Sequence, residues 1–172
     1  MGKANVSAFL RGFTKHGVAF TGTVEGSGQS YGSCPFCNSD SKLYVNESNG
    51  LWDCKKCGRT GDYFGFLGQV AQENVGRFSG SAANVLAKNR GISVSAMRRF
   101  GIGYDQDKYT LAVYGPKNTK GDNPITDVRL YVPGKTSMSS PASKGGLICA
   151  PDNKGSRTVW ICEGEWDRRV VS

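Results

Sequence analysis

Residues 34–58 of the chain read CPFCNSDSKLYVNESNGLWDCKKCG, and this stretch holds four of the six cysteines. The cysteines form two C-x2-C pairs, Cys34 with Cys37 and Cys54 with Cys57, and sixteen residues separate the pairs. Paired cysteines at this spacing are typical of a metal site, because each short turn aims two sulfur atoms at the same point. The stretch therefore decides the fold of the front of the chain.

The segment between the two pairs is expected to be a β-hairpin. Residues 42–46 (KLYVN) and 51–54 (LWDC) have the composition of strands, and Asn49-Gly50 lies between them. Asn-Gly supplies the positive φ angles of a tight hairpin turn. Such a hairpin would bring the second cysteine pair back to the first.

The spacing predicts a structural zinc ion held by Cys34, Cys37, Cys54 and Cys57. Four cysteines close the coordination sphere and leave no position for a reactive water, so we do not expect this zinc to be catalytic. Two disulfides or an iron–sulfur cluster are the alternative interpretations. Cys149 and Cys162, by contrast, lie in apolar runs and are expected to pack as small hydrophobic residues, and the single histidine, His16, lies outside the pattern.

Composition narrows the class of protein. The chain of 172 residues has 22 Lys and Arg against 14 Asp and Glu, a net charge of +8, which favours a polyanionic partner. Its length excludes a large motor protein, and no apolar run approaches the roughly 18 residues of a membrane span. The start of the chain lacks a secretory signal, so we expect a protein of a reducing cytoplasm.

The pattern of apolar residues predicts an α+β protein, in which a zinc ribbon is followed by a mixed α/β unit. We expect the zinc domain over 1–70, a linker over 71–82 and a second domain over 83–172. Residues 25–33 are expected to form a loop. The expected helices are one on the apolar positions 6, 9, 10 and 13, one over 62–70 with Asp62 as its N-cap, and a pair over 82–89 and 93–100. The expected strands are 109–114, 125–132, 146–149 and 158–162.

Zinc ribbons often carry basic and aromatic side chains on the hairpin that contact nucleic acid. Aromatic rings can stack on unpaired bases, while lysine and arginine hold phosphates. For Trp52 a place in the small core of the ribbon is an equally good interpretation. The candidate nucleic-acid-binding residues are Lys42, Tyr44, Asn46, Trp52, Lys55 and Arg59.

The order of motifs resembles bacterial and phage DNA primases. CPFC at 34–37, the hairpin with its second cysteine pair, and GDYFGF at 61–66 look like the primase zinc-binding domain. AKNRGI at 87–92 and MRRFGIGY at 97–104 are similar to the segment that opens the primase RNA polymerase domain. The resemblance implies a zinc-dependent reader of single-stranded DNA template that supports RNA primer synthesis.

Two later segments extend the resemblance. The stretch KTSMSSP at 135–141 is similar to a primase motif, which implies that Arg129 and Lys135 contact nucleotide triphosphate or template phosphate. VWICEGEWD at 159–167 looks like the first motif of the TOPRIM fold, which implies that Glu163 positions catalytic Mg²⁺ or acts as an acid or base.

A complete TOPRIM site also needs an Asp-x-Asp pair after the glutamate, because several carboxylates must hold the metal ions. Only five residues follow Asp167. We therefore expect Mg²⁺ only in a complete primase, and no polymerisation by this chain alone.

The resemblance also implies partners: single-stranded DNA template, ribonucleotides with the RNA primer, and a replicative helicase, in a bacterial cell or a phage-infected host. The alternative is a non-catalytic zinc-ribbon protein that binds DNA or regulates a primase by competing with it. A topoisomerase-related fragment fits less well, because topoisomerase ribbons generally follow the TOPRIM part.

Overall fold

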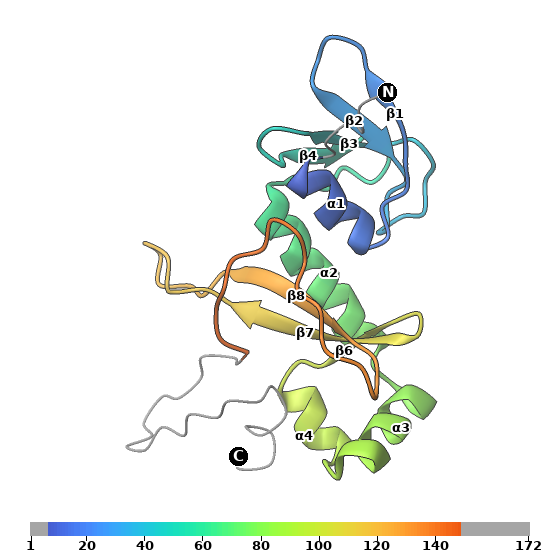
Figure 1. Ribbon diagram of the computed structural model, residues 1–172, viewed down its shortest axis with the longest axis vertical. Coiled ribbons are helices and arrows are strands. Elements are labelled where there is room, and N and C mark those ends of the chain that lie inside the picture. The colour runs from blue at the N-terminus through green and yellow to red at the C-terminus, as the bar shows by residue number, and fades with distance from the viewer. Residues whose placement is uncertain (1–6, 149–172) are drawn as a thin grey trace. The chain divides into compact units, whose positions relative to one another are not determined.

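The computed structural model describes residues 7–148, in which the chain forms two compact units (Figure 1). The first unit comprises Met1–Gly68 and Ser140–Lys144, and the second comprises Gln69–Ser139 and Gly145–Ser172. Both units combine helices with antiparallel sheets. The predicted α+β class is therefore confirmed.

The sheet of the first unit has five strands in sequential order, and every neighbouring pair is antiparallel. Its strands are β1 (Phe20–Val24), β2 (Gln29–Gly32), β3 (Leu43–Asn46), β4 (Trp52–Cys54) and β5 (Thr60–Gly61). The hairpin expected between the cysteine pairs is confirmed as β3 and β4. The loop expected over 25–33 is wrong in part, because its second half is β2, which pairs with both β1 and β3.

The connection between β3 and β4 is a four-residue loop rather than a two-residue turn at Asn49-Gly50. The Asn46 backbone N–H donates to the Leu51 carbonyl at 2.8 Å and closes residues 47–50 into the loop. Gly50 has a φ angle of +71°, which a glycine adopts without steric cost. The sequence thus indicated the right glycine but the wrong loop length.

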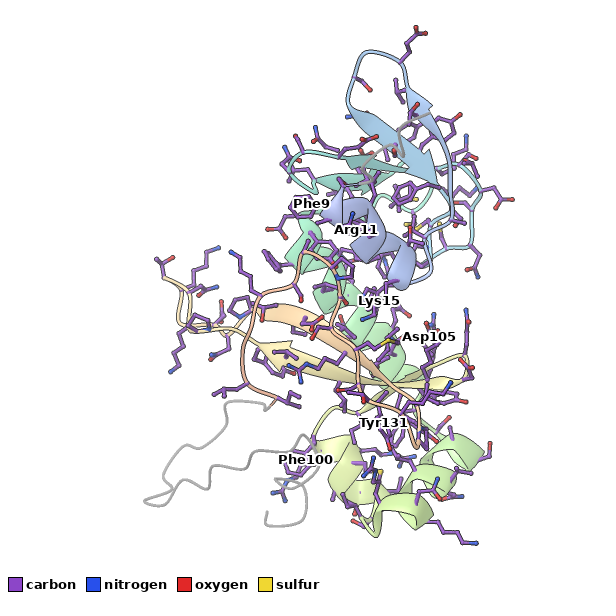
Figure 2. The ribbon with its side chains drawn as sticks, viewed as in Figure 1. Phe9, Arg11, Lys15, Phe100, Asp105 and Tyr131 are labelled. Carbon is purple, nitrogen blue, oxygen red and sulfur yellow. The ribbon has the colours of Figure 1, made fainter. Side chains whose placement is uncertain are left out.

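Replacing Gly50 by alanine should lower the free energy of unfolding of the first unit by about 2 kcal/mol. A Cβ atom there would lie 2.6 Å from Cδ1 of Phe9, which Figure 2 labels on the first helix. Gly28→Ala is the matched control, because Gly28 has a φ angle of +64° but no atom within 4 Å of a Cβ. Urea unfolding should show a loss of only about 1 kcal/mol for the control. Equal losses in both variants would contradict the role of the Phe9 contact.

The core of the first unit is built on aromatic rings. Helix α1 (Ala8–Lys15) and the beginning of helix α2 (Tyr63–Arg77) both contribute to it. Phe66 is 0% exposed, and its ring centroid lies 4.4 Å from that of Phe13 and 5.6 Å from that of Trp52. Ring burial of this kind lets a small unit with short strands retain a packed interior.

The N-cap predicted at the start of α2 is confirmed, but the helix is longer than expected. The Asp62 carboxylate accepts from the Gly65 backbone N–H at 2.7 Å, as an N-cap does. The helix then continues to Arg77, through most of the segment predicted as a linker. That prediction is wrong because Ala71 and Asn74 are buried and give the polar-looking segment an inward face.

The second unit begins within α2 and adds a helix pair and a three-stranded sheet. The helices expected over 82–89 and 93–100 are confirmed, and the Ser93 hydroxyl accepts from the Ala96 backbone N–H at 3.2 Å as the expected N-cap. The additional elements are α3 (Gly80–Arg90), α4 (Val94–Arg99), β6 (Gly103–Asp105), β7 (Lys108–Tyr114) and β8 (Ile125–Tyr131).

The sheet of the second unit has the order β6-β7-β8 and is antiparallel throughout. Strands β7 and β8 confirm two expected strands, whereas β6 was not predicted. Near residues 146–149 the described chain shows only a bridge between Leu147 and Tyr114, and the strand expected over 158–162 lies outside the described residues. One buried hydrophobic cluster of this unit consists of Phe78, Ala83, Leu86, Ile92, Met97, Ile102, Tyr109, Leu111 and Tyr131.

Among residues 7–148, none of the helices combines the length and the apolar character that crossing a bilayer demands.

Candidate metal centre and nucleic-acid interface

The four cysteines of the two C-x2-C pairs come together in the first unit. Their sulfur atoms all lie within 4.8 Å of one another, and we call this group the cysteine centre. Sulfurs of different pairs come close together: those of Cys37 and Cys54 are 3.8 Å apart, and those of Cys34 and Cys57 are 4.0 Å apart. The β3–β4 hairpin thus brings the two pairs together, as the spacing predicted.

Two similar backbone turns aim the sulfurs inward. The Asn38 N–H donates to the Cys34 carbonyl at 2.9 Å, and the Gly58 N–H donates to the Cys54 carbonyl at 2.9 Å. The residue after each pair is left-handed, with φ angles of +53° at Asn38 and +73° at Gly58. Asparagine and glycine are the residues that adopt this conformation most readily. Local sequence therefore shapes both halves of the centre.

The distances fit a tetrahedral ion better than disulfides. Zinc–sulfur bonds of about 2.3 Å place tetrahedral ligands about 3.8 Å apart, whereas a disulfide needs sulfurs at about 2.05 Å. The measured 3.8 and 4.0 Å match the first value. All four cysteines are free thiols in the structure, so the disulfide interpretation is not supported.

Hydrogen bonds around the centre favour thiolates, the form that binds a metal. The Ser39 hydroxyl lies 3.1 Å from the Cys37 sulfur and lowers the pKa of that thiol. Burial tends to raise the pKa of Cys54, but hydrogen bonds from the backbone N–H groups of Cys57 and Lys56 and from the Cys57 and Cys34 side chains together lower the pKa to about 6.

The pKa values of the other two cysteines shift in the opposite direction: burial raises the pKa of Cys57, and it raises the pKa of Cys34 to about 12. A divalent cation at the centre would supply the charge that this buried sulfur needs for ionisation. The donor set therefore fits a bound divalent ion such as zinc.

One surface of the neighbouring sheet stays open to solvent. Burial alternates along β2, β3 and β4, so that one side faces the core and the other does not. The register places Tyr31, Tyr44, Asp53 and Thr60 next to one another across four strands. We call this surface the open face, and its residues are Gly22, Val24, Gln29, Tyr31, Tyr44, Asn46, Asp53 and Thr60.

A row of aromatic and charged groups crosses the open face. The ring centroids of Tyr31 and Tyr44 are 5.9 Å apart, and the Lys55 ammonium lies 5.9 Å from the Tyr44 centroid. Lys55 also forms an ion pair of 2.6 Å with Asp53. Gly22 leaves room for the Tyr31 ring, because a Cβ at position 22 would collide with the Tyr31 hydroxyl.

Beside this row lies a depression of about 500 Å³, which extends from β2 to the start of α2. Its lining combines two aromatic residues, two carboxylates, two amides, one threonine hydroxyl and apolar surface. The lining residues are Gln29, Tyr44, Asn46, Leu51, Trp52, Asp53, Thr60, Gly61 and Asp62.

The candidate nucleic-acid-binding residues do not all lie on the same surface of the first unit. Tyr44, Asn46 and Lys55 lie on or beside the open face, and Lys42 is exposed at the start of β3. Arg59 places its guanidinium 4.7 Å from the Phe36 centroid, beside the cysteine centre.

The structure corrects the prediction that Trp52 contacts nucleic acid. Trp52 is only 2% exposed, and its indole N–H donates to the Asp62 carbonyl at 2.9 Å. Its ring packs against Phe36 and Phe66, so it belongs to the core and does not offer a surface for stacking.

Gln29 and Tyr31 are among the open-face residues that sequence reasoning missed. Both lie in the segment that was expected to be a loop. The alternation of burial along β2 matches a strand, but Gly28 precedes the strand and Gly32 ends it, and these glycines obscured the signal. An aromatic residue within a short alternating run was the available clue.

The remaining candidates lie in the later part of the chain. Arg129 is on β8, where its Nε atom lies 3.9 Å from the Asp127 carboxylate, and Lys135 is exposed just after that strand. Their contacts with nucleotide or template stay a prediction. Glu163, together with Cys149 and Cys162, lies outside the described residues.

No protein-family model and no curated protein matches the chain. Among solved structures, it is similar to a crystal structure of the Aquifex aeolicus primase that contains the zinc-binding and RNA polymerase domains. The match has 15% sequence identity and a TM-score of 0.31, and it covers 80% of this chain. The chain spans about half, 54%, of that primase chain. A TM-score this low does not assign a fold or a function.

Proposed function

We propose that the chain is the front part of a DNA primase, in which a zinc-stabilised sheet recognises single-stranded DNA template. The observation that carries the proposal is the cysteine centre, whose sulfurs lie within 4.8 Å of one another beside an open face with Tyr31 and Tyr44, next to which lies Lys55. The order of primase-like motifs along the sequence supports the same assignment.

In this proposal the zinc ion stabilises the fold, and the sheet contacts the nucleic acid. Zinc, bound by Cys34, Cys37, Cys54 and Cys57, would supply folding energy and no chemistry, because four sulfurs close its sphere. Tyrosine rings can stack on unpaired bases of any sequence, and lysine can contact the backbone phosphates. The net charge of +8 would favour association with the strand.

The proposal also assigns roles to residues that follow the zinc-binding unit, and it names partners. Arg129 and Lys135 would contact nucleotide or template phosphate, and Glu163 would belong to a TOPRIM site that binds Mg²⁺ when complete. RNA primer, ribonucleotides and a replicative helicase are the proposed partners, in the cytoplasm of a bacterial cell or a phage-infected host.

Removal of zinc tests the role of the cysteine centre. The full chain, loaded with zinc, is titrated against a fluorescent single-stranded DNA oligonucleotide and then again after treatment with a chelator. We expect at least a tenfold loss of affinity, because the β3–β4 hairpin loses the cross-link that holds the open face. A duplex of the same sequence is the control and should bind more weakly. Unchanged binding after zinc removal would contradict the proposal.

A further inference from the structure

The depression on the open face is lined by acidic side chains, although the chain as a whole is basic. Its lining includes the carboxylates of Asp53 and Asp62 together with the Tyr44 ring. Carboxylates repel phosphate but accept hydrogen bonds from the edges of bases. We propose that the depression seats one unpaired guanine, and that Asp53 accepts hydrogen bonds from the Watson–Crick edge of this base. The inference rests on the proposed binding of single-stranded DNA and adds the identity of one base.

The position of Asp53 suits this role. It lies between Tyr44 and Thr60 in the register of the sheet, so its side chain belongs to the open face. Lys55 Nζ lies 2.6 Å from its Oδ2 atom. An ionised carboxylate has about four acceptor positions, so this ion pair orients Asp53 and leaves positions on Oδ1 for another donor.

Two other polar side chains of the depression already have partners that hold them in structural roles. One Asp62 oxygen accepts from the Gly65 N–H at 2.7 Å and caps α2. The Asn46 amide oxygen accepts from the Ser48 N–H at 3.0 Å and stabilises the hairpin loop. Of the two carboxylates, Asp53 is the one that does not cap a helix and that the sheet register places on the open face.

Guanine is the base that matches a carboxylate. Its Watson–Crick edge presents two adjacent donors, N1–H and the N2 amino group, which one carboxylate can accept together. Adenine and cytosine each place an acceptor beside their amino donor, and thymine places acceptors on both sides of its N3–H. A carboxylate has no donor for these acceptors, so it discriminates against all three bases.

The surroundings also suit a flat ring. The volume of about 500 Å³ falls within the roughly 300 to 1,000 Å³ that is typical of small-ligand sites. Tyr44 provides an aromatic surface, and Leu51, which is 53% exposed, provides apolar surface on the adjoining strand connection. Buried stacking on such groups contributes affinity without sequence preference, which leaves discrimination to Asp53.

The test uses the full zinc-loaded chain and oligothymidylate probes that differ at one central position. Fluorescence anisotropy measures the dissociation constants of probes with dG, deoxyinosine, dA or dC at that position. We expect dG to bind about tenfold more tightly than dA or dC. Deoxyinosine keeps N1–H but lacks the N2 amino group, so it should bind with intermediate affinity.

A substitution that exchanges acceptor for donor makes the test specific. An asparagine amide can donate to adenine N1 and accept from its amino group, so Asp53→Asn should shift the preference from dG to dA. Asp122→Asn removes the same charge from an exposed position in the second unit and should keep the preference for dG. Circular dichroism and zinc content verify that each variant is folded.

The outcomes separate the inference from the function on which it rests. Binding of all four probes with equal affinity would overturn the guanine site and leave single-stranded DNA recognition standing. A preference for dG that persists in Asp53→Asn would likewise overturn the role of Asp53. Failure to bind any probe would overturn both proposals.

Discussion

Replacing Cys54 by serine is expected to abolish tight zinc binding and to unfold the first unit. Cys54 ends β4, and its sulfur lies 3.8 Å from that of Cys37, so it joins the hairpin to the other cysteine pair. A serine hydroxyl does not ionise near neutral pH and replaces a thiolate poorly. Structural zinc sites contribute roughly 10 kcal/mol or more of apparent binding free energy, which exceeds the stability of a small domain.

The measurement is zinc stoichiometry together with far-ultraviolet circular dichroism of the full chain. Ser39→Ala is the graded control, because it removes only the hydroxyl that lies 3.1 Å from the Cys37 sulfur. We expect the control to weaken zinc affinity by about tenfold and to leave the first unit folded. A Cys54→Ser variant that keeps one tightly bound zinc and a native spectrum would contradict the four-cysteine site.

Acidification is expected to destabilise the first unit through His16. This residue follows α1, is 5% exposed, and places its Nε2 atom 2.6 Å from the Ser140 hydroxyl. Burial, together with the smaller effect of the neighbouring Lys15 charge, lowers the pKa of His16 to about 3. The folded unit therefore holds the imidazole neutral at a pH where the unfolded chain protonates it.

The sign of the effect follows from proton binding. Between about pH 6.5 and pH 3 the unfolded state binds more protons at His16 than the folded state does, so stability falls as the pH falls. At about 1.4 kcal/mol per pH unit, the loss from this group reaches about 2 kcal/mol at pH 5 and about 4 kcal/mol at pH 3.5. Above pH 6.5 the contribution of His16 does not change with pH.

The measurement is urea unfolding of the first unit at a series of pH values with saturating zinc. Trp52 is buried in that unit, and a background in which Trp160 and Trp166 are replaced by phenylalanine makes it the fluorescent reporter. His16→Gln is the matched variant, because glutamine keeps a polar side chain but does not titrate. Acid release of zinc affects both proteins, so the difference between their pH slopes isolates His16. Identical slopes would show that His16 is not the cause.

The sequence predicted the features whose signals are local. The N-cap positions of Asp62 and Ser93 were confirmed because a capping side chain bonds to the backbone only three residues away. The β3–β4 hairpin was confirmed because its strands are close neighbours in the chain. Cysteine spacing likewise indicated the metal centre, since each C-x2-C turn is formed by adjacent residues.

The features that were missed depend on contacts between distant residues. β2 lacks a strong strand composition and exists because β1 and β3 pair with both of its edges. The sequence at the end of α2 has the polar composition of a linker, but Ala71 and Asn74 are buried in the folded chain. In both places tertiary packing outweighs a weak local preference.

By itself, the sequence determined the α+β class, the four cysteines of the centre and the order of primase-like motifs. The tertiary structure decided which side of the sheet each residue occupies, and it buried Trp52 while leaving Tyr31, Tyr44 and Asp53 on the open face. The physical reason is the two-residue period of a strand. A pattern of alternation separates two faces, but only the packing of Phe66 against one of them determines which face is buried.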